Sequence, residues 1–440
     1  MKGPAWLQDL LARAKRGVGR HLAVMVGSTA IGHVLLLATL PVIGRLYDPA
    51  EIGRLGAFAA FLGTASVATA LQYDVMMVSA HSEREAVALF AGVCAVTGPV
   101  ALIASAMLAW LSSQAYLGFE ILPLNAAFWM FAALVVTQLF FTLRYWVMRD
   151  EAFGQIAKVT VLQSGVRAIA PILLYPLSAT WVSLVAAEVV GRCAGLRTLL
   201  RGRGRALREA ARGLQWTEVA RAFRRLPQVP LAGVPSALIN ASAQYLPLPL
   251  VASGFGATAA GYFGVVQRAM QAPIILIGRN VADVFHARVA RHVREAPERV
   301  VPLFWRTALA LLLVGAIPSF LIVLVGRFLL VTLLGPRWAE AGDLLAAMVP
   351  WSFASFVVSP LSRAILVFRG QALKLIYDGL SLTGVVVVFS VARRLNAPLN
   401  TTVWMWSWTQ AAAYVVYFLV LTQVVRRAPP SAPSLPMAAP

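Results

Sequence analysis

Charged side chains with the chemistry to bind an anion stand inside stretches of this chain that are otherwise apolar. Arg167 lies in the middle of LQSGVRAIAPILLYP, residues 162–176, and Glu188 lies in the next apolar stretch. A turn is expected near Ser178, eleven residues after Arg167 and ten before Glu188. On antiparallel neighbouring helices the two side chains would therefore lie at similar depth. The pattern predicts either an internal ion pair or an arginine that faces a hydrated cavity beside a carboxylate that tunes it.

A second arginine, Arg268, lies near the middle of another apolar stretch, and glutamines flank it in VVQRAMQAP. Polar residues spaced four apart, which share one face of a helix, occur in other apolar stretches as well. Such stripes either form hydrogen bonds between helices or line a hydrated central cavity, and arginines at mid-depth favour the cavity. Arginine pairs well with phosphate or carboxylate and stays charged. The candidates for binding an anionic substrate are Arg167, Arg268, Gln267, Gln271, Asn240, Gln244, Glu188 and Gln138.

Four further residues are candidates for a gate or for ion coupling: Arg45, Arg54, Asp74 and His33. The two arginines lie near the outer end of the first predicted hairpin, but pairing with Asp48 and Glu51 in the turn is the favoured interpretation. Asp74 is either an ion or proton site or an ordinary carboxylate at a helix end. His33 lies mid-helix and could carry a proton, although a structural role is favoured.

The chain shows no motif for a cofactor or a bound metal. There is no P-loop, Gly-rich dinucleotide loop, HExxH or GxSxG sequence, and the histidines show no metal-ligand spacing. The only cysteines are Cys94 and Cys193, so a disulfide framework is not supported. We therefore expect no cofactor and no metal, and coupling to a proton or sodium gradient stays open. Short, His-poor outer loops argue against a membrane enzyme such as a polysaccharide polymerase or acyltransferase.

Long apolar helices must position these residues. Of the 440 residues, 59% are hydrophobic and only 13% are charged, and the mean hydropathy is +0.74; a soluble protein carries roughly 25% charged residues. An all-α integral membrane protein with about twelve transmembrane helices is therefore predicted. The expected spans are 22–43, 52–73, 86–111, 122–146, 156–176, 179–199, 229–252, 257–283, 303–330, 341–366, 373–392 and 399–425.

The basic residues predict the orientation of the chain. The formal charge of +20 could suggest nucleic acid, but most Lys and Arg residues fall between spans on one side, as the positive-inside rule requires of the cytoplasmic face. Only Arg45, Arg54, Arg337, Arg393 and Arg394 fall on the other side. We predict that both termini are cytoplasmic and that nucleic acid is not a partner.

An Arg-rich linker divides the chain into two sets of six spans. The predicted parts are an amphipathic segment (1–21), an N-lobe (22–199), the linker (200–228), a C-lobe (229–425) and a disordered tail (426–440). The linker either contacts anionic lipid or a cytoplasmic partner or, as favoured, is a solvated segment. In DPAEIGRLGAF (48–58) and GATAAGYFGVV (256–266), Gly53 and Gly56 match Gly261 and Gly264, which predicts a parallel repeat of two lobes.

Several stretches together resemble Wzx-type polysaccharide flippases of the multidrug/oligosaccharidyl-lipid/polysaccharide exporter superfamily. They include LPVIGRLYDPAEIGRLGAF, LQYDVMMVSAHSEREA, RYWVMRDEAFGQIAKVTVLQS and LLGPRWAEAGDLLAAMVPWSFASFVVSPLS. The resemblance implies two six-helix lobes in a V around a cationic cavity. It also implies a multi-pass protein of the bacterial inner membrane that moves a polyprenyl-diphosphate-linked glycan to the outer leaflet by alternating access, for O-antigen, capsule or exopolysaccharide synthesis.

Within that resemblance, Arg167 and Arg268 would attract the diphosphate or acidic sugars. Membrane lipids and other polysaccharide-assembly proteins would be further partners. The chain departs from the family in one place, where Gln72-Tyr73-Asp74 stands instead of the frequent Arg-Tyr-Glu. A drug/cation antiporter of the same superfamily is the alternative, although acidic rather than basic residues would then be expected in the cavity.

Overall fold

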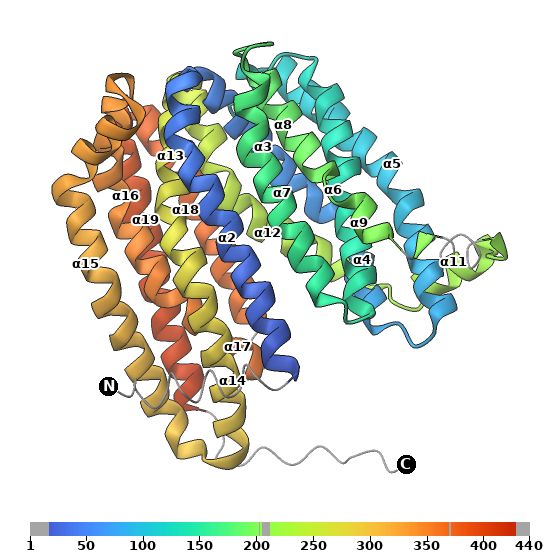
Figure 1. The fold of residues 1–440 in the computed structure, drawn as a ribbon. Helices are drawn as coiled ribbons and strands as arrows, with labels where there is room; N and C mark the ends of the chain where they lie inside the picture. Colours follow the sequence, from blue (N-terminus) through green and yellow to red (C-terminus); the bar gives the residue numbers. More distant parts are fainter. Residues whose placement is uncertain (1–16, 202, 205–211, 369–370, 428–440) are drawn as a thin grey trace, which may run out of the picture. The chain divides into compact units, whose positions relative to one another are not determined.

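The computed structural model describes residues 17–201, 203–204, 212–368 and 371–427. Most of the predicted amphipathic segment 1–21 and most of the predicted tail 426–440 lie outside these residues. The described part is α-helical and contains no β-strand (Figure 1). It forms two compact units, one ending at Gly264 and the other beginning at Val265.

The first unit contains a long series of helices and the start of the helix that leads into the second unit. They are α2 (Gly17–Leu46), α3 (Pro49–Thr69), α4 (Tyr73–Met76), α5 (Glu83–Ser113), α6 (Ala126–Arg149), α7 (Phe153–Leu174), α8 (Trp181–Cys193), α9 (Leu196–Leu200), α11 (Trp216–Arg224), α12 (Val234–Tyr245) and α13 (Pro247–Pro273). The second unit continues with α14 (Arg279–Glu295), α15 (Val300–Leu334), α16 (Ala339–Leu361), α17 (Ala364–Val367), α18 (Gln371–Arg394) and α19 (Leu399–Arg426).

Ten helical segments of the described chain are long and apolar enough to cross a membrane. One of them, Val229–Glu295, has 67 residues and covers the two predicted spans 229–252 and 257–283. Its helical path breaks at Gly256, which has φ +83°, between those two spans. The predicted span 179–199 is present as α8, which has 13 residues. Each predicted span thus coincides with a helix, although α8 is shorter than expected.

The surface of these helices is apolar. Phe128, Phe320 and Phe328 are 71%, 67% and 75% exposed, and dozens of other large hydrophobic side chains are exposed with them. Exposed apolar area on this scale is unfavourable in water and is what a helix bundle presents to lipid. The chain is therefore a multi-pass membrane protein.

Local sequence explains how the first hairpin turns. Asp48 accepts a hydrogen bond from the backbone N–H of Ala50 at 3.0 Å, and Pro49 occupies the first position of α3. An Asp cap followed by proline is a strong helix-start signal, because the carboxylate satisfies a free N–H and proline has none to satisfy. Ser82 caps α5 in the same way by accepting from the N–H of Glu85 at 3.1 Å.

The glycines on which the predicted repeat rests lie at one helix contact. A Cβ atom on Gly53 would overlap the backbone carbonyl oxygen of Ala257, and one on Gly261 would overlap that of Pro49. Only residues without side chains let α3 and the first part of α13 approach this closely, as small residues do in membrane helix pairs. Gly56 and Gly264 both face the side chain of Leu248.

The two compact units do not divide at the predicted linker. Residues 229–264 belong to the first unit, because α12 packs on α3 and α13 meets it through the glycine contact. The predicted lobe boundaries, 22–199 and 229–425, therefore stay a prediction about the repeat and are not the limits of the compact units.

The Arg-rich segment 200–228 is not wholly a solvated linker, which was the favoured interpretation. Its residues 216–224 form α11, which packs on α5 (Figure 1). Val219 and Ala222 are buried in that contact, and both contribute to an apolar cluster with residues of α5. The reason is an amphipathic pattern in which Val219, Ala222 and Phe223 fall on one helical face.

Candidate functional site

The predicted pair of charged residues forms part of a triad in the first unit. The Arg167 Nε atom on α7 donates to Glu188 Oε2 on α8 at 2.7 Å. On the other side, an Arg192 guanidinium nitrogen lies 2.8 Å from Glu188 Oε1. One carboxylate thus holds two guanidinium groups, one from a neighbouring helix and one from four residues along its own.

A glycine permits this geometry. A Cβ atom on Gly191 would overlap Cγ of Arg167, so the arginine stem crosses α8 where the helix has no side chain. Arg167 comes from the middle of α7 and reaches Glu188 across this gap. The sequence of α8 therefore provides both the carboxylate and the space through which its partner approaches.

Polar groups from two other positions fix the second arginine. Arg192 donates to Thr137 Oγ1 on α6 at 3.0 Å. Gln163 on α7 donates to the backbone carbonyl of Arg192 at 2.9 Å. Arg192 is therefore held between three helices, whereas the Arg167 side chain is held through its Nε atom by Glu188.

The triad carries a surplus positive charge. Two guanidinium groups and one carboxylate sum to +1, and the side chains of Arg167, Arg192 and Glu188 are 33%, 21% and 18% exposed. Arg167 is the most accessible of the three. Its guanidinium has five N–H donors and uses Nε on Glu188, so its terminal nitrogens can pair with a phosphate or carboxylate while the ion pair stays intact.

Two predicted residues with different expected roles, Gln138 and Asp74, lie together. Gln138 donates to Asp74 Oδ2 at 3.1 Å and to Thr142 Oγ1 at 3.2 Å. Asp74 also accepts from the N–H of Val75 at 3.1 Å. Gln138 and Asp74 are 2% and 8% exposed, and burial raises the pKa of the Asp74 carboxyl. Asp74 is thus a buried carboxylate in the short α4, between two candidate spans.

The arginine near the first turn has a structural partner. Arg54 pairs with Glu51 and donates through Nε to the carbonyl oxygen of Ile121 at 3.2 Å. The other oxygen of Glu51 accepts from the N–H of Trp181, at the start of α8, at 2.6 Å. Arg54 thus pairs within the turn, with Glu51. Arg45 lies exposed in the last turn of α2.

His33 has a local partner in α2. Its Nδ1 lies 2.8 Å from the carbonyl oxygen of Thr29, one turn earlier. This contact accounts for one ring nitrogen within its own helix and agrees with the structural interpretation that the sequence favoured.

The polar stripes fall in both units. Asn240 and Gln244 are exposed on α12 of the first unit. Arg268 is exposed and Gln267 and Gln271 are half-buried on the part of α13 that belongs to the second unit. Asn240 and Gln244 thus share the first unit with the Arg167–Glu188–Arg192 triad.

One charged pair in the second unit was not predicted. Lys374 donates to Asp378 Oδ2 at 2.6 Å within α18, and the Asp378 side chain is 5% exposed. Tyr377 stacks on Tyr417 of α19, with ring centroids 4.2 Å apart. Spacing of four residues in a helix was the signal for this pair, as it was for Glu188 and Arg192.

The described residues contain no group of three or more His, Cys, Asp or Glu side chains arranged to hold a metal ion. The site is thus built from guanidinium, carboxylate, amide and hydroxyl groups.

The fold has counterparts among solved membrane transporters. MurJ, a lipid II flippase in an inward closed conformation, is 11% identical with a TM-score of 0.65, over 93% of this chain and 90% of that chain. An inward-facing multidrug resistance MATE family transporter of the MOP superfamily is 15% identical with a TM-score of 0.58, over 92% of this chain and 94% of that chain. A point mutant of the Vibrio cholerae MATE transporter VcmN is 12% identical with a TM-score of 0.57, over 92% of this chain and 97% of that chain.

No protein-family model and no curated protein sequence matches the chain. At these low identities the likeness is one of fold. It shows the all-α, two-lobe fold of the MOP-superfamily transporters, as the sequence predicted.

Proposed function

We propose that this protein is a flippase that moves a polyprenyl-diphosphate-linked oligosaccharide from the inner to the outer leaflet of the bacterial inner membrane by alternating access. The observation that carries the proposal is the triad, in which Glu188 neutralises only one of two arginines. A surplus positive charge among apolar helices is costly and is expected where a function requires it. A diphosphate would compensate that charge.

Arg167 is the proposed contact to the substrate, because its terminal nitrogens remain accessible beside the ion pair. Arg268, with Gln267 and Gln271, is proposed as a second contact region. Glu188 and Arg192 position Arg167 and set the charge of its surroundings. The Wzx-type resemblance supports a lipid-linked glycan as the substrate, and the solved lipid II flippase has a similar fold.

A drug/cation antiporter is the second candidate, and buried carboxylates favour it. Asp378 lies 2.6 Å from Lys374, however, so an ammonium group already neutralises it. Asp74 remains as the carboxylate with a raised pKa, and we propose it as the candidate for proton coupling. The excess of arginine over carboxylate at the triad favours an anionic substrate.

The test is a strain that lacks this gene, complemented with wild-type protein, Arg167→Gln or Arg393→Gln. Arg393 is an exposed residue near the end of α18, and its substitution removes the same charge from the second unit. We expect complete lipid-linked repeat units to accumulate on the cytoplasmic leaflet in the deletion strain and with Arg167→Gln, but not with Arg393→Gln.

Accumulation on the outer leaflet would instead indicate a polymerase or another later step. Unchanged lipid-linked glycan together with altered sensitivity to cationic drugs would favour the antiporter. Normal export by Arg167→Gln at equal protein level would remove Arg167 from the substrate path.

A further inference from the structure

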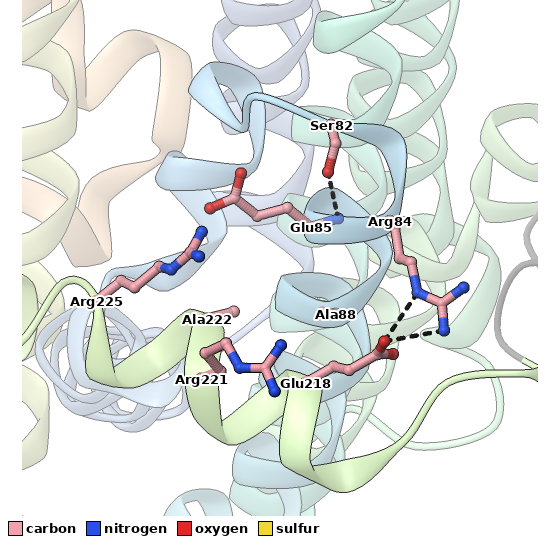
Figure 2. Close-up of a pocket in the computed structure, with 8 residues that line it drawn as sticks. All are labelled: Ser82, Arg84, Glu85, Ala88, Glu218, Arg221, Ala222 and Arg225. Atoms are coloured by element: carbon pink, nitrogen blue, oxygen red, sulfur yellow. Dashed lines mark hydrogen bonds and ion pairs between the residues drawn. The ribbon is translucent and has the colours of Figure 1, made fainter.

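A small charged pocket lies where the first turns of α5, at the start of a candidate span, meet α11 (Figure 2). Its volume is about 160 Å³. Arg84 and Glu85 line it from α5, and Glu218, Arg221 and Arg225 line it from α11 and the residue that follows. Three arginines and two glutamates give this pocket a formal charge of +1.

The pocket is built on a helix with a fixed position. The ring of Phe223 on α11 stacks on Tyr73, with centroids 4.1 Å apart and planes at 16°. The Tyr73 hydroxyl donates to the backbone carbonyl of Phe223 at 3.1 Å. Gly92 on α5 has no side chain where Val219 and Phe223 pack. These contacts dock α11 against α5, so the arginines of α11 are held beside α5.

The charged groups of the α5 side are already engaged. Arg84 donates through Nε to Glu218 at 2.9 Å and through a terminal nitrogen to the carbonyl of Gly213 at 3.3 Å. The hydrogen bond from Arg84 lowers the pKa of the Glu218 carboxyl, which therefore stays ionised at neutral pH. Glu85 accepts from the backbone N–H of His81 at 2.9 Å.

Arg221 and Arg225 are different. They stand one turn apart, and both are exposed. Neither makes a hydrogen bond or a close ion pair through its side chain with any described residue, although the charge of Arg221 contributes to lowering the pKa of Glu218. Figure 2 shows Arg225 facing Glu85 across the pocket. Two guanidinium groups at this spacing offer donors to one anionic group placed between them.

The position of the pocket indicates the source of that anion. The α5 span begins at Glu83, next to the pocket, so the pocket lies at the level of the lipid headgroups. Trp216 begins α11 and is 71% exposed. Exposed tryptophan beside arginines on an amphipathic helix is typical of a segment at the membrane interface.

We propose that this pocket binds the phosphodiester headgroup of an anionic phospholipid, with Arg221 and Arg225 as its ligands. The Arg84–Glu218 pair holds the pocket in shape, and Trp216 lies at the boundary of the acyl chains. This site is separate from the triad, and the inference does not depend on which substrate is transported.

The test measures lipid binding to the purified full chain in a neutral detergent, by native mass spectrometry. The probes are phosphatidylglycerol, phosphatidylcholine and inorganic phosphate. The variants are wild type, the double substitution Arg221→Gln/Arg225→Gln and the matched double substitution Arg393→Gln/Arg394→Gln, which removes two exposed charges from the end of α18.

We expect phosphatidylglycerol to bind the wild type and the α18 control equally, and the α11 variant about thirtyfold more weakly. Each single substitution, Arg221→Gln or Arg225→Gln, should weaken binding about fivefold. These two single variants provide the test if the double variant does not fold.

Four results would overturn the proposal. Equal weakening in both double variants would mean that only overall charge matters. Equal binding of phosphatidylcholine would show that the negative charge is irrelevant. Phosphate competing at the same concentration as phosphatidylglycerol would indicate a site for a free anion. Displacement of the lipid by polyprenyl diphosphate at a much lower concentration would assign the pocket to the substrate.

Discussion

Substitution of Glu188 by glutamine tests the charge arrangement of the triad. The carboxylate bonds Arg167 at 2.7 Å and Arg192 at 2.8 Å, and an amide of the same shape removes its charge and leaves both arginines in place. Two guanidinium groups that share one carboxylate stand roughly 5 Å apart, and at an effective dielectric constant of about 20 their repulsion is about 3 kcal/mol.

Screening reduces the contribution of Arg167, which is one-third exposed, while the better-buried Arg192 loses its main compensation. We expect Glu188→Gln to lower the stability by about 3 kcal/mol, near the lower limit for removing one member of a buried ion pair. The assay is thermal denaturation of the purified protein in detergent, where this loss corresponds to a fall in Tm of roughly 3 °C.

A double variant tests whether the surplus positive charge causes the loss of stability. Glu188→Gln/Arg192→Gln removes the surplus charge together with the carboxylate, so it should recover most of the lost stability. An unchanged Tm for Glu188→Gln, or a double variant no better than the single one, would refute the reasoning. The double exchange Arg167→Glu/Glu188→Arg should restore the stability only in part, because the new arginine at position 188 would face Arg192.

The remaining predictions concern packing and orientation. Gly53→Ala and Gly261→Ala should each destabilise the protein by about 1–3 kcal/mol, since the new methyl group meets a backbone carbonyl. The control in the same Tm assay is Gly254→Ala, where a Cβ meets nothing within 4 Å. Equal effects at all three positions would contradict the close approach of α3 and α13. Single cysteines at the exposed positions Ser113 and Arg212 should be labelled by membrane-impermeant reagents from the outer and the inner side, respectively. Labelling of both positions from the same side would contradict the predicted topology.

The sequence predicted the helices and the main charged pair for clear physical reasons. Long apolar runs leave the backbone no alternative to helix in a bilayer, and equal distance from a turn placed Arg167 and Glu188 together. The third member of the triad, Arg192, was not singled out from the sequence. Its spacing of four residues from Glu188 was the available signal.

Other features depend on how helices rotate and dock, which the spacing of residues does not determine. Gln138 and Asp74 are 64 residues apart, and nothing in either segment indicates the other as its partner. The α11 helix was expected to be part of a solvated linker because arginines dominate the composition of segment 200–228. Three apolar residues are nevertheless enough to dock it on α5. The division after Gly264 likewise follows from a contact between distant segments.

The glycine contact between α3 and α13 has the form of a symmetric dimer interface. Gly53 meets the carbonyl of Ala257, and Gly261 meets that of Pro49; each glycine lies four residues after the carbonyl that its counterpart touches. Partners that present the same surface to one another make an isologous contact, the kind that joins two identical subunits about a twofold axis. One polypeptide here contains both copies of that surface. A change at either glycine therefore has a twin position 208 residues away, and related chains are best compared by treating the two positions as a single site that changes in pairs.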